Sequence, residues 1–252
     1  MKAPLAALLT DFGHEDHFVG VMKGVILSRA PGARLVDLCH GVAPQDVRGA
    51  ALRLRASVRY FPEGTLFVCV VDPGVGSPRP ILWARTQEHQ FLAPDNGLLS
   101  WVGPFRRLRR VENRGLFLKP VSRTFHGRDV FAPAAAALLA GLKPSELGPE
   151  AAGMVSWPYP APRRVAGRWR GEVLTVDRFG NAVTNLEPRH VGARRVLEAC
   201  GRRFPLRTHY ACVAEGRPVA VVGSSGSIEL SLRGGNLSGG SRVRAGEAVH
   251  VR

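Results

Sequence analysis

The residues of this 252-residue sequence that are best placed for chemistry lie where an apolar run meets a loop, at Asp72. Residues 65–71 are mostly apolar and β-favouring, and a Pro- and Gly-rich loop leads from Asp72 to Arg79. Because Pro fixes the backbone and Gly frees it, this loop can turn Arg79 back towards Asp72 and hold an oriented ion pair. Such a pair offers a fixed positive charge for electrostatic catalysis. It can equally be a surface salt bridge at a strand-end turn, and the loop alone leaves both interpretations open.

Further polar groups occupy comparable positions: Asp11, the pair Asp95–Asn96, and His126. Asp11 follows the apolar run 5–9, and His126 stands where a helical pattern begins. Parallel strands bring their carboxyl ends to one edge of a sheet, so groups far apart in the sequence converge there. Each group alone could be a helix cap, a turn or a satisfied core residue. Together with the ion pair, they predict a site at this edge.

A metal or nucleotide site is not predicted. His14, Asp16 and His17 are possible ligands, but no HExxH motif or second His/Cys pair completes a coordination shell. No GxGxxG or GxxxxGK[ST] loop is present to hold phosphates. The segment GSSGS at 223–227 lies between two β-like runs and is predicted to be a hairpin turn rather than a nucleophile elbow.

The elements that must position these groups alternate between strand and helix patterns. Apolar runs at 5–9, 35–38 and 65–71 predict strands, and Asp46 is expected to cap a helix that extends through residue 58. Another helix is predicted from the spacing of apolar residues between 19 and 26. This alternation predicts a mainly parallel sheet.

The rest of the first half has a less regular pattern. Residues 81–86 and 89–94 predict a hairpin, and residues 108–113 an edge strand. A short helix is expected to begin at 95–98, and a longer one to cover 126–141.

A proline-rich stretch at 154–164 is the predicted linker between two domains, 1–153 and 165–252. The first is predicted to be an α/β domain. Short β-like runs separated by Gly-rich turns predict a small antiparallel barrel or sandwich for the second. These runs are 171–177, 182–186, 210–216, 219–223, 227–232 and 247–252.

The net charge of +15 is the outlying feature of the composition, and it comes mainly from arginine. A basic surface binds phosphate chains without sequence preference, so nucleic acid is a partner to consider. The arginines fall in short clusters at 106–110, 163–170 and 202–207, without a recognition motif. No specific nucleic-acid partner is therefore predicted, and a basic nucleic-acid-binding protein stays an alternative.

The sequence predicts a cytoplasmic protein without a membrane span. No stretch approaches 18 uninterrupted apolar residues, and Asp11 follows the N-terminus too closely for a signal peptide. Cys39, Cys69, Cys200 and Cys212 lack CxxC spacing, which favours reduced core thiols over disulfides or zinc.

Several motifs together resemble, in order and over nearly the whole chain, the S-adenosylmethionine (SAM) hydroxide adenosyltransferases, the adenosine-forming SAM hydrolases related to bacterial fluorinase and chlorinase. They are LLTDFGHEDHFVGVMKGVIL, VVDPGVGSPR, APDNGLLS, TFHGRDVFAPAAA, VDRFGNAVTNL and VGSSGSIEL. The resemblance implies an α/β N-terminal domain, a β-barrel C-terminal domain and a homotrimer. It also implies that SAM binds where the N-terminal domain of one subunit meets the C-terminal domain of its neighbour.

The resemblance assigns roles to residues of the first domain. Asp72, Arg79 and His126 match the family's set that holds and polarises a water molecule. Asp11 matches the acid that binds the ribose hydroxyls. Asp95–Asn96 lies within a family motif, without a specific role.

Residues of the second domain match contacts to the two ends of SAM. Asp177 and Asn181 match the groups that hold the methionine amino end and the adenine edge. Ser224 aligns with another contact to the ligand.

The sequence departs from the halogenase branch at Gly127, where the fluorinase has a halide-binding serine, and in the DPGVG loop with its arginine. Both departures favour water over halide as the nucleophile. The segment HEDH at 14–17 is richer in histidine than expected for the family, so its contacts stay open.

The resemblance thus implies hydrolysis of SAM to adenosine and L-methionine, by attack of water or hydroxide on the ribose C5′. A sulfonium leaves as a neutral thioether and needs no general acid, and this chemistry needs no metal or other cofactor. A SAM-dependent halogenase on the same scaffold is the alternative within the family.

Overall fold

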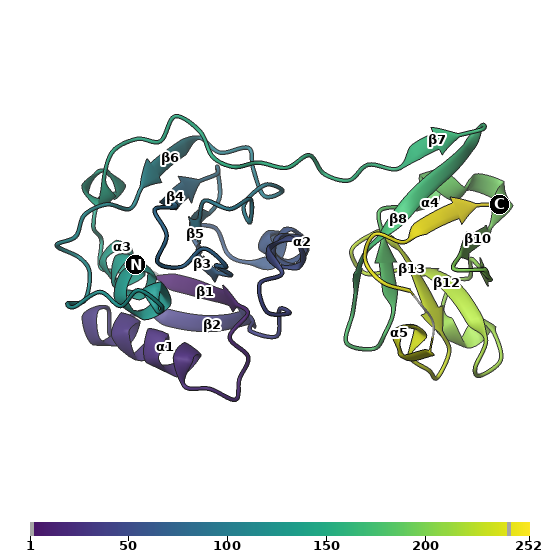
Figure 1. The fold of residues 1–252 in the computed structure, drawn as a ribbon, viewed down its shortest axis with the longest axis horizontal. Helices are drawn as coiled ribbons and strands as arrows, with labels where there is room; N and C mark the ends of the chain where they lie inside the picture. The colour runs from purple at the N-terminus through teal and green to yellow at the C-terminus, as the bar shows by residue number, and fades with distance from the viewer. Residues whose placement is uncertain (1–2, 241–242) are drawn as a thin grey trace. The chain divides into compact units, whose positions relative to one another are not determined.

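The computed structural model describes residues 3–240 and 243–252, which form two compact units (Figure 1). The first extends to Pro158, and the second is Tyr159–Arg252. The division falls inside the proline-rich segment 154–164, whose last two residues already belong to strand β7 (Arg163–Val165).

The first unit contains one six-stranded sheet with the strand order β2-β1-β3-β5-β4-β6. Strands β2, β1, β3 and β5 are parallel, whereas β4 runs antiparallel to both of its neighbours, β5 and β6. The mainly parallel sheet, the β4–β5 hairpin and the edge position of β6 are confirmed. The bounds are β1 Leu5–Thr10, β2 Arg34–Cys39, β3 Leu66–Val70, β4 Ile81–Arg85, β5 Gln90–Pro94 and β6 Arg107–Arg110.

Helices cover both faces of this sheet, because successive side chains of its buried strands point to opposite faces. From β1, Ala6 and Leu8 pack in the core with α1 (Phe18–Arg29) and α3 (Ala132–Leu139). Ala7 and Leu9 pack instead with α2 (Val47–Ser57). The unit is therefore a three-layer α/β sandwich, as predicted.

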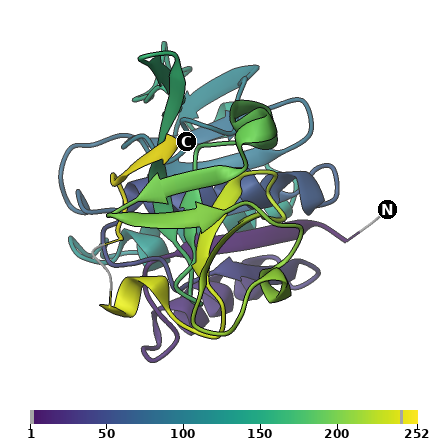
Figure 2. The same ribbon diagram turned by 90° about the vertical axis from the view of Figure 1, so that its right-hand side faces the viewer.

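The second unit is an antiparallel sheet in the order β11-β10-β14-β8-β9-β13-β12, with β7 paired to β8 (Figure 2). A bridge between Leu206 and Ala220 links the two ends of this order, so the sheet is a nearly closed barrel. Its core contains Leu197, Phe204 and Leu230. The bounds are β8 Arg168–Val176, β9 Ala182–Thr184, β10 Val196–Ala199, β11 Arg202–Pro205, β12 Pro218–Val222, β13 Ile228–Leu232 and β14 Ala248–Val251.

Short helical turns complete both units. They lie at Val58–Tyr60, Gly127–Phe131, Pro144–Leu147, Pro188–Val191, Gly192–Arg194, Tyr210–Cys212 and Leu237–Gly240.

Some predicted elements are wrong. Residues 210–216 do not form a strand, because they begin with a 3-10 turn at Tyr210–Cys212. Residues 95–98 form turns rather than the start of a helix. The prediction of core thiols is confirmed for Cys69, which is buried, but is wrong for Cys200 and Cys212, which are exposed.

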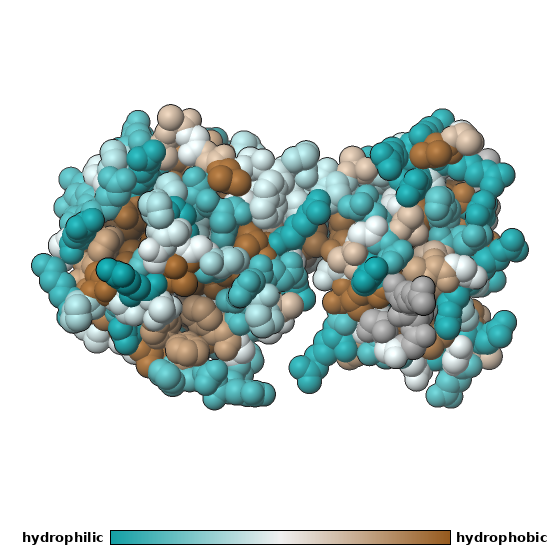
Figure 3. All heavy atoms as spheres, viewed as in Figure 1, coloured by the Kyte–Doolittle hydropathy of each residue, from teal (hydrophilic) through white to brown (hydrophobic). Residues whose placement is uncertain are grey.

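Hydrophilic side chains are spread over the visible face of both units (Figure 3). Within residues 3–240 and 243–252, none of the helices has the length and apolar character needed to span a bilayer.

Candidate active site

Two of the predicted acids lie side by side at the carboxyl edge of the parallel sheet. Strands β1 and β3 are neighbours with Thr10 opposite Val70, so Asp11 and Asp72 follow the ends of adjacent strands. Both line a hollow of about 350 Å³. Its lining also includes Phe12, Phe18, Pro44, Gln45, Val70, Pro73, Val75, Thr124, Phe125, His126 and Gly127.

The loop after β3 returns the arginine to the acid, as its composition predicts. Arg79 Nε donates to both carboxylate oxygens of Asp72, at 2.6 and 2.8 Å, and Arg79 Nη2 also contacts Oδ2. Only 5 % of the Asp72 side chain and 11 % of the Arg79 side chain are exposed. Gly76 has a φ of +80°, a left-handed conformation that glycine adopts without strain. The surface salt bridge that the sequence left open is therefore excluded, because this pair is largely buried.

His126 completes the set. It precedes a turn of π-helix at Gly127–Phe131 that leads into α3, and such turns are frequent at functional sites. Its Nδ1 lies 3.1 Å from Arg79 Nη2. Burial lowers the pKa of His126, and the positive charge of Arg79 lowers it further, so the ring is neutral near pH 7. Because a guanidinium only donates, Nδ1 is the acceptor and Nε2 carries the hydrogen.

Asp11 is held by a backbone amide from the start of the second helix. The N–H of Gln45 donates to Asp11 Oδ2 at 2.7 Å. Gln45 has a φ of 65°, which is uncommon for a residue other than glycine and often marks a functional site. Asp46, the next residue, caps α2 by accepting from the N–H of Gly49 at 2.8 Å, as predicted.

An aromatic cluster, which was not predicted from the sequence, forms the apolar wall of the hollow. The ring centroids of Phe18 and Phe125 are 5.0 Å apart, and Phe12 lies 5.8 Å from Phe18 and 5.9 Å from Phe125. The sequence did contain a clue to this cluster, because Phe12 directly follows Asp11 and Phe125 directly precedes His126. Aromatic faces attract cations, and an apolar wall excludes water.

The pair Asp95–Asn96 supports the site from outside the hollow. Asn96 Nδ2 donates to the carbonyl of Val71 at 2.9 Å, directly before Asp72. Asp95 Oδ1 accepts from the N–H of Val155 at 2.7 Å. These contacts give both residues structural roles that the sequence did not assign.

The histidine-rich segment 14–17 is exposed. The His14 ring packs edge-on against His40 at 5.2 Å, and His17 packs against Phe18 at 4.8 Å. In the part of the chain that the structure describes, no three His, Cys, Asp or Glu side chains gather as a metal ion would require.

In the second unit, Asp177 and Asn181 belong to one tight loop between β8 and β9. Asp177 Oδ1 accepts from the N–H groups of Phe179 and Asn181 at 2.9 and 2.8 Å, and Oδ2 accepts from Asn181 Nδ2 at 2.9 Å. Phe179, in the same loop, is 76 % exposed. This loop thus combines a partly exposed carboxylate and amide with an exposed aromatic ring.

Ser224 lies in the turn between β12 and β13, where the N–H of Gly223 donates to the carbonyl of Ser227 at 2.8 Å. The predicted hairpin turn at 223–227 is thus confirmed. Because β9 pairs with β13, the Asp177 loop lies at the end of β13 that is farther from this turn.

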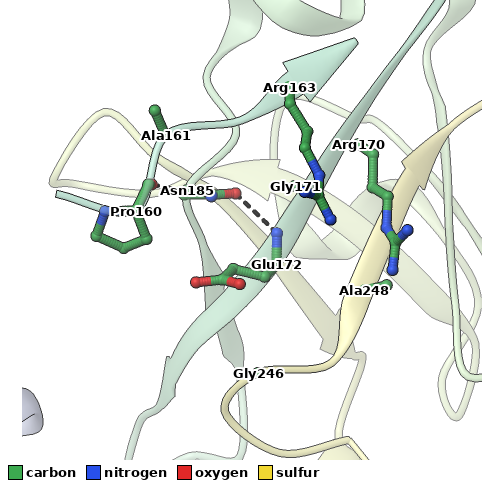
Figure 4. Close-up of a pocket in the computed structure, with 9 residues that line it drawn as sticks. All are labelled: Pro160, Ala161, Arg163, Arg170, Gly171, Glu172, Asn185, Gly246 and Ala248. Atoms are coloured by element: carbon green, nitrogen blue, oxygen red, sulfur yellow. Dashed lines mark hydrogen bonds between the residues drawn. The ribbon is translucent and has the colours of Figure 1, made fainter. Parts of the chain in front are cut away.

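A separate hollow of about 230 Å³ lies in the second unit (Figure 4). Arg163 and Arg170 stand opposite each other on β7 and β8 and line it with Glu172. Asn185 fixes its floor by accepting from the N–H of Glu172 at 2.8 Å. Its lining contains charged groups but no Ser, Cys or His to act as a nucleophile or base. The set around Asp72 is therefore the better candidate for chemistry.

Two family models match the chain. The SAM hydroxide adenosyltransferase N-terminal domain matches residues 6–148, and the C-terminal domain of the same family matches residues 171–250.

Similar proteins extend over the full length. A protein of Thermus thermophilus named (R)-S-adenosyl-L-methionine hydrolase is 43% identical over 96% of this chain and 97% of its own length. A protein of the same name from Salinispora tropica is 35% identical over 98% of this chain and 97% of its own. A fluorinase of an Actinoplanes species is 27% identical over 98% and 97%.

Among solved structures, an uncharacterized conserved protein from Thermotoga maritima superposes with a TM-score of 0.88 at 34% identity, over 97% of this chain and 98% of its own. Both halves of the chain are thus matched by one family, in the order that the motifs indicated. The chain belongs to the SAM hydroxide adenosyltransferase family.

Proposed function

We propose that this protein hydrolyses S-adenosyl-L-methionine to adenosine and L-methionine, by attack of water or hydroxide on the ribose C5′. The observation that carries the proposal is the contact of Arg79 with both Asp72 and His126 beside a hollow that Asp11 also lines. Relatives named as hydrolases of this substrate support it.

The substrate would lie with its ribose hydroxyls on Asp11 and its sulfonium against the phenylalanine wall. A positive sulfur suits aromatic faces, and a carboxylate suits a vicinal diol. A hollow of about 350 Å³ is at the small end of ligand pockets, which range over roughly 300–1,000 Å³. We propose that Asp177, Asn181 and Ser224 hold the methionine amino end and the adenine edge.

The reaction forms one bond and breaks one. The water oxygen bonds to C5′, the C5′–S bond breaks, and its electron pair stays on sulfur as the neutral thioether of methionine. One water proton is released for each turnover. The leaving group needs no protonation, so the protein must mainly align and desolvate the nucleophile.

The three residues divide this task. Asp72 lines the hollow and can accept a hydrogen from the attacking water, while His126 Nε2–H can donate to its oxygen. Arg79 fixes both side chains and supplies a permanent positive charge that stabilises developing hydroxide. With its Nδ1 occupied by Arg79, His126 acts as a hydrogen-bond donor rather than as a base. No metal or other cofactor takes part in this scheme.

The relatives' names specify the (R) substrate, and we propose the same preference here. The sulfonium is a stereocentre, so inversion at sulfur exchanges the positions of its methyl group and its aminocarboxypropyl chain. A hollow that fixes the ribose at Asp11 therefore holds the methionine end differently in each epimer. Parallel assays with separated epimers would show faster turnover of the (R) form, and equal rates would refute this preference.

We also propose a cytoplasmic homotrimer in which SAM bridges the first unit of one subunit and the second unit of its neighbour. Support comes from the division of the candidate contacts, since the Asp72 set and the Asp177 loop belong to different units. Small-molecule sites often lie where domains or subunits meet.

The test is to incubate purified protein with SAM in chloride-free buffer containing EDTA, and to identify the nucleoside by chromatography and mass. Adenosine and methionine in equal amounts are expected. A product that appears only with added halide would favour the halogenase alternative. Salt-sensitive retention on DNA or RNA without any turnover would favour the nucleic-acid-binding alternative.

A further inference from the structure

A series of hydrogen bonds, buried at Thr10 and His40, holds the loop that carries Asp11 in place. Thr10 and His40 are fully buried, and Thr10 Oγ1 lies 2.8 Å from His40 Nδ1. On the other side of the ring, His40 Nε2 lies 2.9 Å from Asp37 Oδ1. Lys23 Nζ donates to the second oxygen of Asp37 at 2.7 Å. This series of hydrogen bonds thus extends from the surface pair Lys23–Asp37 to the end of β1.

The direction of each hydrogen bond follows from the chemistry of the groups. Burial lowers the pKa of His40, so the ring is neutral near pH 7. A carboxylate only accepts, so His40 Nε2 carries the hydrogen and Nδ1 accepts from the Thr10 hydroxyl. The Thr10 oxygen in turn accepts from the N–H of Phe12 at 3.2 Å. The ring orientation is therefore transmitted to the backbone directly after Asp11.

His40 holds the same loop a second time through its main chain. The N–H of Gly13 donates to the carbonyl of His40 at 2.9 Å. The Thr10 side chain before Asp11 and the Gly13 backbone after it are thus both tied to His40, while Gln45 holds the carboxylate itself. Burying a polar ring is costly unless its hydrogen bonds are made, and here both ring nitrogens are used.

We propose that His40 and Thr10 are positioning residues for Asp11, so that recognition of the substrate's ribose diol depends on the Thr10–His40–Asp37 relay. The inference rests on the proposed function, because it assigns the diol to Asp11. The relay acts on the substrate through the loop and does not touch the reacting atoms. Since ribose binding acts on the ground state and the transition state alike, damage to the relay raises KM more than it lowers kcat.

The test compares Thr10→Val, which keeps the shape but removes the hydroxyl, with Thr10→Ser, which keeps the hydroxyl. Calorimetry measures the Kd of adenosine and of 2′,3′-dideoxyadenosine for each protein. The wild type is expected to prefer adenosine by roughly ten- to hundredfold, from hydrogen bonds to a charged group. Thr10→Val should lose most of this preference, and Thr10→Ser should retain it.

Asp37→Ala provides a second test outside the core, because the Asp37 side chain is 39 % exposed. It removes the acceptor of His40 Nε2 and should lower the diol preference in the same direction, even if Thr10→Val fails to fold. A role in folding alone would lower the melting temperature and leave the ratio of the two Kd values unchanged. An unchanged ratio in folded Thr10→Val or Asp37→Ala would overturn the proposal.

Failure of the proposed function gives a different pattern. A wild type that prefers adenosine over its dideoxy analogue but does not turn over SAM would refute the hydrolysis and leave the relay intact. A wild type without any diol preference would refute the assignment of Asp11, and with it the relay.

Discussion

Arg79 is the residue on which the geometry of the candidate site depends. Its guanidinium contacts Asp72 and His126, which come from different elements and lie 54 positions apart in the numbering. With 11 % of its side chain exposed, it is shielded from bulk water, where its charge would be screened. Loss of this one side chain should therefore disorganise both of its partners.

Replacing Arg79 by alanine should lower kcat at least about 100-fold, the usual cost of losing a preorganised charge in an active site. Binding of SAM should be largely retained, because Arg79 is not assigned a substrate contact. Calorimetry and single-turnover assays measure the two effects separately. Arg109→Ala is a matched control, since 16 % of the Arg109 side chain is exposed and it pairs with Glu150 rather than with a residue of the candidate site. Wild-type turnover by folded Arg79→Ala protein would refute the role.

The protonation of His126 should set the acid limit of activity. Its pKa lies below the ordinary value of 6.5, mainly through burial and then through Arg79. The neutral ring is therefore present above pH 6.5. As the pH falls through the lowered pKa, Nδ1 gains a proton that faces Arg79, and kcat should fall. Because the unfolded chain binds this proton more readily, folding stability also declines as the pH falls below 6.5.

A pH profile of kcat tests this expectation, with His126→Gln as the matched variant. Glutamine keeps a donor and an acceptor but does not titrate, so its profile should be flatter on the acid side. An equally steep acid limb in His126→Gln would assign the titration to another group.

At the scale of elements, the sequence predicted the parts of the fold that local patterns encode. Continuous apolar runs predicted β1 and β3, the spacing of apolar residues predicted α1, and the Asp46 cap predicted the start of α2. The prediction of a strand at 210–216 was wrong, because a short apolar run does not distinguish a strand from a 3-10 turn. Strands β10 and β11 were missed, since each has only four residues and β11 begins with two arginines.

The candidate site was predictable only in part. Asp11 and Asp72 could be placed together because adjacent parallel strands share an edge. The resemblance, rather than spacing, linked Arg79 to His126. The buried relay through His40 was not foreseen, because its hydrogen bonds join residues distant in the sequence and its histidine has no motif of its own.

The cap of α2 offers a test at this scale. Asp46→Ala should lower the free energy of unfolding by about 1 kcal/mol, the typical loss of an N-cap. Asp46→Ser should retain most of it. Hydrogen exchange of the Gly49 amide, which donates to Asp46, reports the loss locally. Unchanged protection in the alanine variant would show that the cap contributes nothing.

At the scale of the whole molecule, the proposed contacts are divided between two units. The Asp72 set belongs to the first and the Asp177 loop to the second. If one SAM bridges two subunits, each site needs an intact first unit from one chain and an intact second unit from another. Two chains with defects in different units could then complement each other.

Co-expression of Arg79→Ala and Asp177→Ala chains tests this sharing. Each variant alone should be inactive or nearly so. In a random mixture of equal amounts, a site receives an intact first unit in about half of the cases and, independently, an intact second unit in about half. About one quarter of the wild-type activity should therefore be restored. Sites formed within single chains would give no recovery, and a monomer in analytical ultracentrifugation would likewise refute the trimer.

The central claim is that water attacks C5′ of SAM. A reaction in ¹⁸O-enriched water, with mass analysis of both products, tests it most directly. We predict one ¹⁸O atom in the 5′-hydroxyl of adenosine and none in methionine. Adenosine without the label, or release of adenine or methylthioadenosine instead, would contradict attack at C5′ and the role given to the Asp72–Arg79–His126 set.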